Sequence, residues 1–143
     1  MPMDTHTEQA KRLLDENGYT CVLYNGEREV HSYERGVKPL LTFLESNTDF
    51  RGFTAADKIV GAGAAHLYVL LGVRSVWANV ISKSAAAVLE NAGISALYGE
   101  IAPYIVNRAG NGPCPIETAT KGIADSHEAL IAIKTKLAEL KGN

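Results

Sequence analysis

Apolar residues recur with the period of an α-helix in three parts of the chain. The segment 5–16 carries Ala10, Leu13 and Leu14 on one face and stops before Gly18, a residue type that commonly follows a helix end. A second segment opens at 36–39, where Pro39 suits the first turn because first-turn amides have no intrahelical partner to lose. A third begins at about Asp125. The apolar stripes of the last two are Val37, Leu40, Leu41 and Leu44, and Leu130, Ile133, Leu137 and Leu140.

Other parts of the chain have the composition of strands. Residues 19–24 and 28–33 flank Asn25-Gly26, the dipeptide most typical of a tight hairpin, and so predict two antiparallel strands. Further strands are predicted at 52–56, 75–81 and 94–98, and the strand at 75–81 is apolar enough to be central.

Two more helices fall between these strands. The segment 57–71 is apolar nearly all round, which predicts a helix buried on more than one side. The segment 85–89 has Ser82 or Ser84 as a cap and Gly93 as its end. The order α-β-β-α-β-α-β-α-β, followed by a C-terminal extension, predicts a three-layer α/β/α sandwich around a mixed five-stranded sheet. We expect one domain over residues 1–143.

Composition narrows the possible partners. The 143 residues carry a formal charge of −2 and no basic cluster, so we expect neither nucleic-acid nor membrane-surface binding. The polar start predicts no signal peptide, and two distant cysteines, Cys21 and Cys114, are typical of reduced thiols. We therefore expect a cytoplasmic protein. Four histidines without ligand spacing give no reason to expect a metal or another cofactor.

Three segments carry a resemblance to a known family. They are 32–40 (SYERGVKPL), 56–61 (ADKIVG), and 103–108 (PYIVNR) through 114–117 (CPIE). On these residues the chain resembles a small prokaryotic family of uncharacterised proteins that is assigned to the cytidine deaminase-like fold. The resemblance covers nearly the whole chain, and it implies the same fold here. The family itself implies no settled activity.

Zinc deaminases place His-x-Glu or Cys-x-Glu after the hairpin and Pro-Cys-x-x-Cys at the next helix. In this chain the first position holds Glu34-Arg35-Gly36 and the second holds 56–60, without a His or Cys at either. The run 113–117 echoes the cysteine motif, but it follows the fifth strand, which is the wrong place in this topology. Zinc-dependent deamination is therefore not expected, because an acid without a metal-bound water cannot perform this hydrolysis.

The resemblance brings several polar residues to one crevice. In this fold the helix starts after the second and third strands face each other, so Ser32, Arg35, Gly36, Asp57 and Lys58 would converge. Two helix dipoles with Arg35 and Lys58 would suit an anion or phosphate. Equally, Asp57 caps its own helix while both cations are solvated or paired with nearby acids.

The loop 107–114 offers further candidates. Asn107, Arg108 and several glycines would let this loop close over the crevice and donate to an anion, although an ordinary turn explains the same residues. Cys114 stands at a loop-to-helix junction where a thiol pKa falls, but no histidine lies near it in sequence.

Three classes of function remain open: ligand binding, catalysis, and a structural or regulatory role. The leading hypothesis is a non-zinc deaminase-like domain that binds a small phosphate-bearing ligand of nucleotide or ADP-ribose type. The alternatives are a metal-free transferase or hydrolase that uses Asp57 or Cys114 (with Lys58 as a further catalytic candidate), or a structural or regulatory module that oligomerises. In each case the sheet edge and the last helix favour a homo-oligomer.

Overall fold

The computed structural model describes residues 4–107 and 109–141. Helices and strands alternate after an initial hairpin, and two helices follow the last strand. In chain order they are α1 (Thr5–Asn17), β1 (Cys21–Tyr24), β2 (Glu29–Ser32), α2 (Lys38–Glu45), β3 (Thr54–Val60), α3 (Ala62–Leu71), β4 (Ser75–Ser82), α4 (Lys83–Asn91), β5 (Ser95–Ala102), α5 (Pro115–Thr120) and α6 (Ser126–Lys141).

The five strands form one mixed sheet in the order β2-β1-β3-β4-β5. β1 pairs antiparallel with β2 and β3, whereas β3, β4 and β5 run parallel. One row across the sheet therefore aligns Ser32, Cys21, Asp57, Ala78 and Tyr98. Because β3, β4 and β5 end at the same edge, the helices α3 and α4 both start there.

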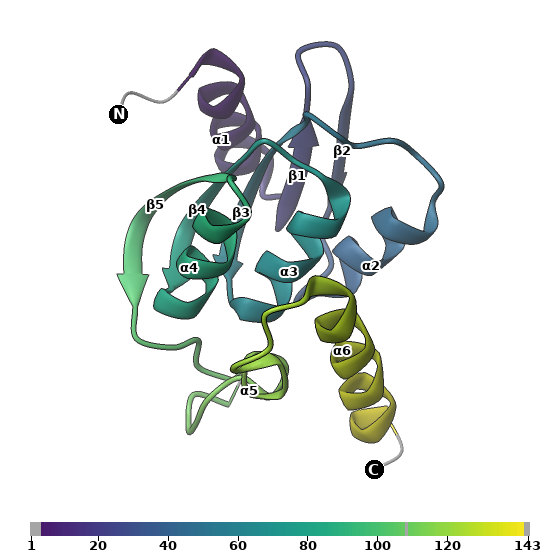
Figure 1. The fold of residues 1–143 in the computed structure, drawn as a ribbon. Helices are drawn as coiled ribbons and strands as arrows, with labels where there is room; N and C mark the ends of the chain where they lie inside the picture. Colours follow the sequence, from purple (N-terminus) through teal and green to yellow (C-terminus); the bar gives the residue numbers. More distant parts are fainter. Residues whose placement is uncertain (1–3, 108, 142–143) are drawn as a thin grey trace.

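Helices cover the two faces of the sheet unequally. α1 alone packs on one face, where its Ala10 and Leu14 meet Val22, Ala56 and Trp77. α2, α3 and α4 cover the other face around a larger core, and α5 and α6 lie beyond α3 at the lower end of the view in Figure 1. The observed fold is thus an α/β domain with a five-stranded mixed sheet flanked by helices, as predicted from the order of the segments.

α3 is the most deeply buried helix. Eight of its ten residues are buried, because α3 contacts the sheet, α2, α4, α5 and α6. Its near-uniform apolar character, which predicted burial on several sides, is explained by these neighbours. In the part of the chain that the structure describes, no helix is long and apolar enough to span a bilayer.

The single tryptophan marks the contact of α1 with the sheet. Trp77 is 9% exposed, and its indole N–H donates to Oδ1 of Asn79 at 3.0 Å. The Lys11 ammonium of α1 lies 4.5 Å from the centroid of the indole ring, a cation–π distance. Trp77 belongs to the smaller core beneath α1, apart from the larger core.

Several element boundaries differ from the predicted ones. The hairpin is confirmed, but its loop is the four residues 25–28, held by Asn25 Oδ1, which accepts from the amides of Glu27 and Arg28. β3 continues to Val60, so the prediction of a helix starting at Asp57 was wrong. β5 extends to Ala102, and the short helix α5 was not predicted.

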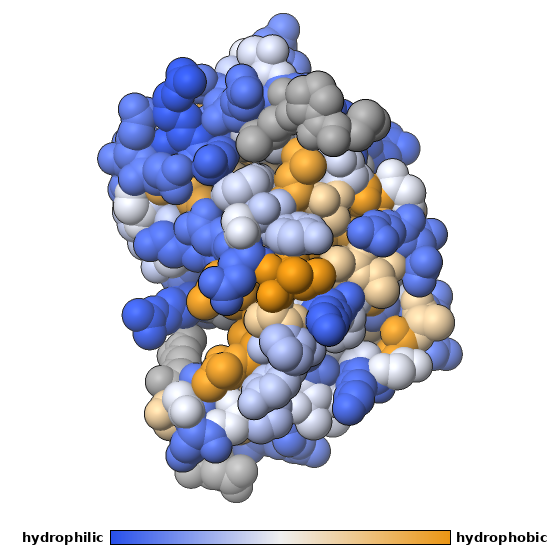
Figure 2. All heavy atoms as spheres, turned by 90° about the vertical axis from the view of Figure 1, so that its left-hand side faces the viewer, coloured by the Kyte–Doolittle hydropathy of each residue, from blue (hydrophilic) through white to orange (hydrophobic). Residues whose placement is uncertain are grey.

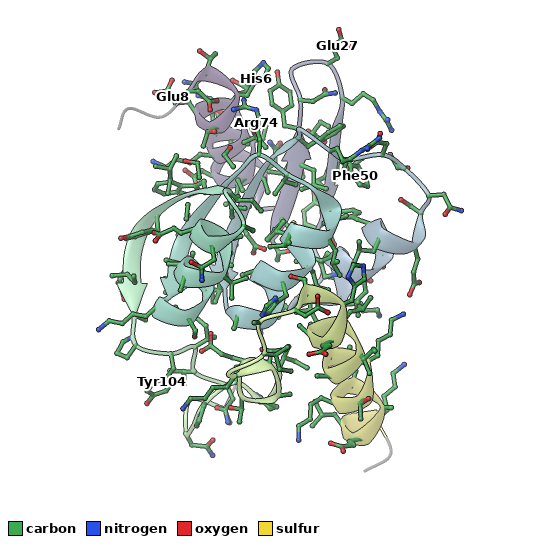
Figure 3. The ribbon with its side chains drawn as sticks, viewed as in Figure 1. His6, Glu8, Glu27, Phe50, Arg74 and Tyr104 are labelled. Atoms are coloured by element: carbon green, nitrogen blue, oxygen red, sulfur yellow. The ribbon has the colours of Figure 1, made fainter. Side chains whose placement is uncertain are left out.

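The start of α1 is joined to the start of β4. Asp4 caps the helix by accepting from the Thr7 amide at 2.9 Å, and it also accepts from Arg74 Nη1 at 2.8 Å. Figure 3 shows Arg74 beside His6 at this end of the sheet. The Arg74 hydrogen bond holds the pKa of Asp4 well below its ordinary value.

We predict that Asp4→Ala lowers the free energy of unfolding by about 1–2 kcal/mol, because the helix cap and the Arg74 contact are lost together. Asp4→Asn should cost less, since an asparagine side chain still caps the helix. Urea denaturation of both variants measures the difference. Asp15→Ala, on the exposed face of the same helix, is the control. Equal losses in Asp4→Asn and Asp4→Ala would show that the cap contributes nothing.

Candidate functional site

Asp57 and Lys58 lie inside β3 and not at the start of a helix. Consecutive residues of a strand point to opposite faces of the sheet. Asp57 is accordingly buried beneath α3, whereas Lys58 is exposed. The prediction that a helix dipole acts on these two residues was therefore wrong. Because the two side chains lie on opposite faces of the sheet, they cannot contact one ligand atom from the same side.

Asp57 ends a buried chain of three polar side chains. Tyr68 of α3 donates its hydroxyl proton to Asp57 Oδ2 at 2.6 Å, and Cys21 Sγ lies 3.2 Å from the same hydroxyl oxygen. Because the Tyr68 proton is directed to the carboxylate, the Cys21 thiol is the donor of the second bond. The sequence pattern around Cys21 gave no sign of its contact with Tyr68.

Burial sets the protonation of this cluster. It raises the pKa of Asp57 to about 7, although hydrogen bonds from Tyr68 and from the Ile59 and Lys58 amides act in the opposite direction. Burial, together with the nearby Asp57 charge, raises the pKa of both Cys21 and Tyr68 well above their ordinary values. Asp57 is the member that exchanges a proton near neutral pH, a property more typical of functional sites than of structural carboxyls.

The two exposed cations, Lys58 and Arg35, lie at the same end of the sheet. The Lys58 amide donates to the Thr20 carbonyl at 3.2 Å, and the Thr20 hydroxyl donates to the carbonyls of Ser32 and Glu34. Thr20 thus ties β3 to the segment that carries Arg35. Among the described residues, neither Arg35 nor Lys58 forms an ion pair with a carboxylate.

Ser32 and Gly36 shape the turn between β2 and α2. Ser32 Oγ accepts from the Glu34 amide at 3.0 Å, which leaves its hydroxyl proton available to another group. Gly36 has a φ of 71°, a conformation that a side chain would strain. Both predicted residues therefore lie near Arg35 and help to fix where its backbone turns.

The start of α3 is occupied by a residue that the sequence did not single out as functional. Glu117 of α5 is 6% exposed and accepts from the Ala62 amide at 2.9 Å and from the Ile105 amide at 2.6 Å. It also accepts from the hydroxyl of Ser82, the residue that caps α4. One carboxylate thus receives three donors at the edge where β3 and β4 end, which is where α/β proteins often bind anions.

Two glycines allow α5 to approach so closely. A Cβ atom on Gly63 would lie 2.6 Å from Cγ2 of Ile116, and one on Gly61 would lie 3.1 Å from Oε2 of Glu117. Gly61 also offers no side chain to cap α3. The run Gly61-Ala62-Gly63 after a strand was the available signal for an anion at this helix start, and the anion is supplied by the chain itself.

The loop after β5 is held by its own side chains. Asn107 Nδ2 donates to Asn111 Oδ1 at 2.9 Å, and Asn107 Oδ1 accepts from the Asn111 amide at 3.2 Å. Asn107 thus binds within its loop. Arg108, predicted as an anion contact, lies outside the described residues. Cys114 is half-buried at the residue before α5, and its amide donates to the Ile105 carbonyl at 2.8 Å.

The described residues contain no group of three or more His, Cys, Asp or Glu side chains placed to hold a metal ion. A groove of about 290 Å³ lies between α2, α3 and α6. It shares no residue with the predicted site, since it is lined by Leu41, Leu44, Glu45, Leu70, His127, Leu130 and Lys134.

The mixed sheet and its helices define the chain as an α/β domain, and comparison with known proteins gives its family. The model of the TM1506 family, described as a domain of unknown function (DUF1893), matches residues 9–137. The chain therefore belongs to the DUF1893 family. No curated protein matches it significantly.

A solved structure supports the fold. The crystal structure of a DUF1893 family protein (TM1506) from Thermotoga maritima is similar over 97% of this chain and 92% of that one, with a TM-score of 0.84. The two sequences are 24% identical, so the similarity concerns the fold alone.

We predict that the stability of the protein falls as pH rises from about 4 to 7 through Asp57. The folded state keeps a proton on this carboxyl that the unfolded chain, with an ordinary pKa near 3.9, has already released. Above pH 7 the effect is complete and amounts to about 4 kcal/mol. The difference between wild type and Asp57→Asn, measured by urea unfolding at several pH values, isolates this term.

Asp57→Asn should therefore gain stability relative to wild type as pH rises through this window. Asp15→Asn removes an exposed carboxyl and should follow the wild-type curve. A wild-type minus Asp57→Asn difference that is constant from pH 4 to 8 would show that Asp57 titrates normally.

We also predict that Glu117→Ala lowers the free energy of unfolding by about 3–5 kcal/mol, because it leaves three donors without their acceptor. Glu117→Gln should cost less, since the amide oxygen still accepts. Thermal and urea denaturation measure both. Glu128→Ala, an exposed residue in the first turn of α6, is the control. Wild-type stability in Glu117→Ala would mean that the carboxylate does not hold α5 in place.

Proposed function

We propose that the domain binds a small phosphate-bearing ligand of nucleotide or ADP-ribose type, on a cytidine deaminase-like scaffold that uses no zinc. The scaffold assignment is supported by the order of elements, a hairpin followed by parallel strands with helices between them. The ligand's phosphate would meet Lys58 and Arg35 at the end of the sheet where β2 and β3 finish.

The observation that carries the proposal is the pair of exposed cations without carboxylate partners among the described residues. Thr20 joins the two segments that bear them, so both cations lie at the same end of the sheet. A phosphate accepts from lysine as a point charge and from arginine through two parallel bonds. The Ser32 hydroxyl would add a donor, because only its oxygen is engaged within the turn.

The helix-start site at α3 is not the proposed phosphate site. Glu117 already satisfies its donors, and a second anion beside that carboxylate would be repelled. The proposed phosphate site therefore depends on side-chain charge and not on helix dipoles. Asp57 then lies on the opposite face of the sheet from Lys58. Its side chain would not contact the phosphate, but its protonation would modulate the ligand site.

Isothermal titration calorimetry against nucleotides, phosphosugars and nucleotide sugars tests the proposal. We expect binding by at least one class, and a tenfold or greater loss of affinity in Lys58→Ala and in Arg35→Ala. Arg28→Ala, an exposed arginine in the hairpin loop at the opposite end of the sheet, is the matched control and should bind normally. Absence of binding throughout the panel, or affinity unchanged in Lys58→Ala, would refute the proposal.

A further inference from the structure

β5 is an open edge of the sheet. The strand order ends at β5, so the outward backbone groups of its eight residues have no strand neighbour in the described chain. Proteins usually protect such edges with charges, prolines, bulges or short strands. β2, at the other edge, is only four residues long and begins at Glu29, whereas β5 carries one charged residue, Glu100, and no proline.

Apolar side chains accompany this edge into solvent. Tyr98 and Ile101 of β5 are 40% and 41% exposed. Tyr104 and Val106, in the segment that follows, are each 51% exposed, and Figure 3 shows Tyr104 projecting outward there. Figure 2 looks onto this side of the molecule and shows hydrophobic residues gathered in a largely hydrophilic surface. An open strand with apolar neighbours is a typical protein-binding edge.

We propose that β5 pairs antiparallel with β5 of a second copy, around a two-fold axis at Gly99, so that two five-stranded sheets form one of ten strands. The residues of β5 are self-complementary in this register. Gly99 lies opposite itself on the axis, where any larger side chain would meet its own copy. Tyr98 lies opposite Glu100, and Leu97 lies opposite Ile101.

The charges favour a second copy over an unrelated peptide. Two antiparallel copies of β5 could oppose their carboxylates, which would be repulsive. With the axis at Gly99, each Glu100 instead faces the hydroxyl-bearing Tyr98, and the apolar Leu97 and Ile101 face each other. The strand thus contains both halves of its own cross-strand pairs.

The strand supplies only part of the contact area that a stable dimer needs. Eight residues of strand are about 27 Å long, and side chains on the two faces give an edge of roughly 500 Å² per copy. Stable interfaces bury about 800 Å² per partner, so the strand alone is too small. The antiparallel register carries Tyr104 and Val106 past the start of the second β5, and these half-exposed side chains supply additional apolar area.

Solution mass measurements test the dimer. We expect sedimentation equilibrium to give twice the chain mass of 15.3 kDa as concentration rises. Ile101→Lys should shift the protein to monomer, because a lysine would face Leu97. Ile131→Lys, which alters a more exposed isoleucine on α6, should remain dimeric. A wild-type monomer at every concentration, or a dimer unaffected by Ile101→Lys, would overturn the proposal.

A charge exchange at Tyr98 tests the register. Tyr98→Glu opposes two carboxylates across the axis and should weaken the dimer at least tenfold, whereas Tyr98→Lys faces Glu100 and should preserve it. Circular dichroism confirms that each variant is folded. Equal effects of the two substitutions would exclude the axis at Gly99. If β5 binds a different peptide and not a second copy, all variants will be monomeric in the absence of that peptide. That result would also overturn the proposal.

Disulfide formation gives an independent measurement. In a Cys114→Ser background, a mixture of Tyr98→Cys and Glu100→Cys chains should form a mixed disulfide, since directly opposed residues lie within bridging distance. Each variant alone should cross-link little, because its own cysteines are not opposed. Cross-linking that is as strong within one variant as in the mixture would contradict the proposed pairing.

Discussion

The arrangement of the last forty residues depends on the carboxylate of Glu117, which lies at the edge of the sheet where β3 and β4 end. It joins three parts of the chain: the start of α3, the cap of α4 and the loop after β5. Without it, the amide at the start of a deeply buried helix would lack an acceptor, and α5 would lose its side-chain bonds to the start of α3 and to the cap of α4. The glycines at 61 and 63 are the backbone counterpart of this contact, since they leave room for α5.

Much of the fold follows from local patterns. The hairpin, the parallel strands and the stripe of α6 were predictable because period and turn chemistry act over a few residues. The boundary at Asp57 failed because Asp57 and Lys58 resemble the polar first turn of a helix. The β-branched pair Ile59-Val60, which favours a strand, and the extended Gly61 determine the actual start of α3. α5 was missed because six residues contain too little period, although Pro115 and Glu117 in a first turn are typical signals.

The candidate site was less predictable than the fold, for a geometric reason. Sequence reasoning grouped Asp57 with Lys58 because they are adjacent, but a strand directs neighbours to opposite faces. Asp57 instead accepts from Tyr68 in the second turn of α3, and Tyr68 in turn contacts Cys21 of β1; these residues are 11 and 36 positions from Asp57, separations that no local pattern records. The residues on the turn after β2 lie at the same end of the sheet as Lys58, because the topology of the sheet alone fixes that end.

The position of Trp77 gives the protein an optical reporter of one layer. Because it is the sole tryptophan and lies in the small core beneath α1, its fluorescence senses the docking of that helix and little of the opposite layer. The contact of the Lys11 ammonium with its ring is lost if α1 detaches, whereas the bond to Asn79 stays within β4. An emission change that precedes the loss of far-ultraviolet ellipticity would therefore separate release of α1 from unfolding of the sheet and its larger core.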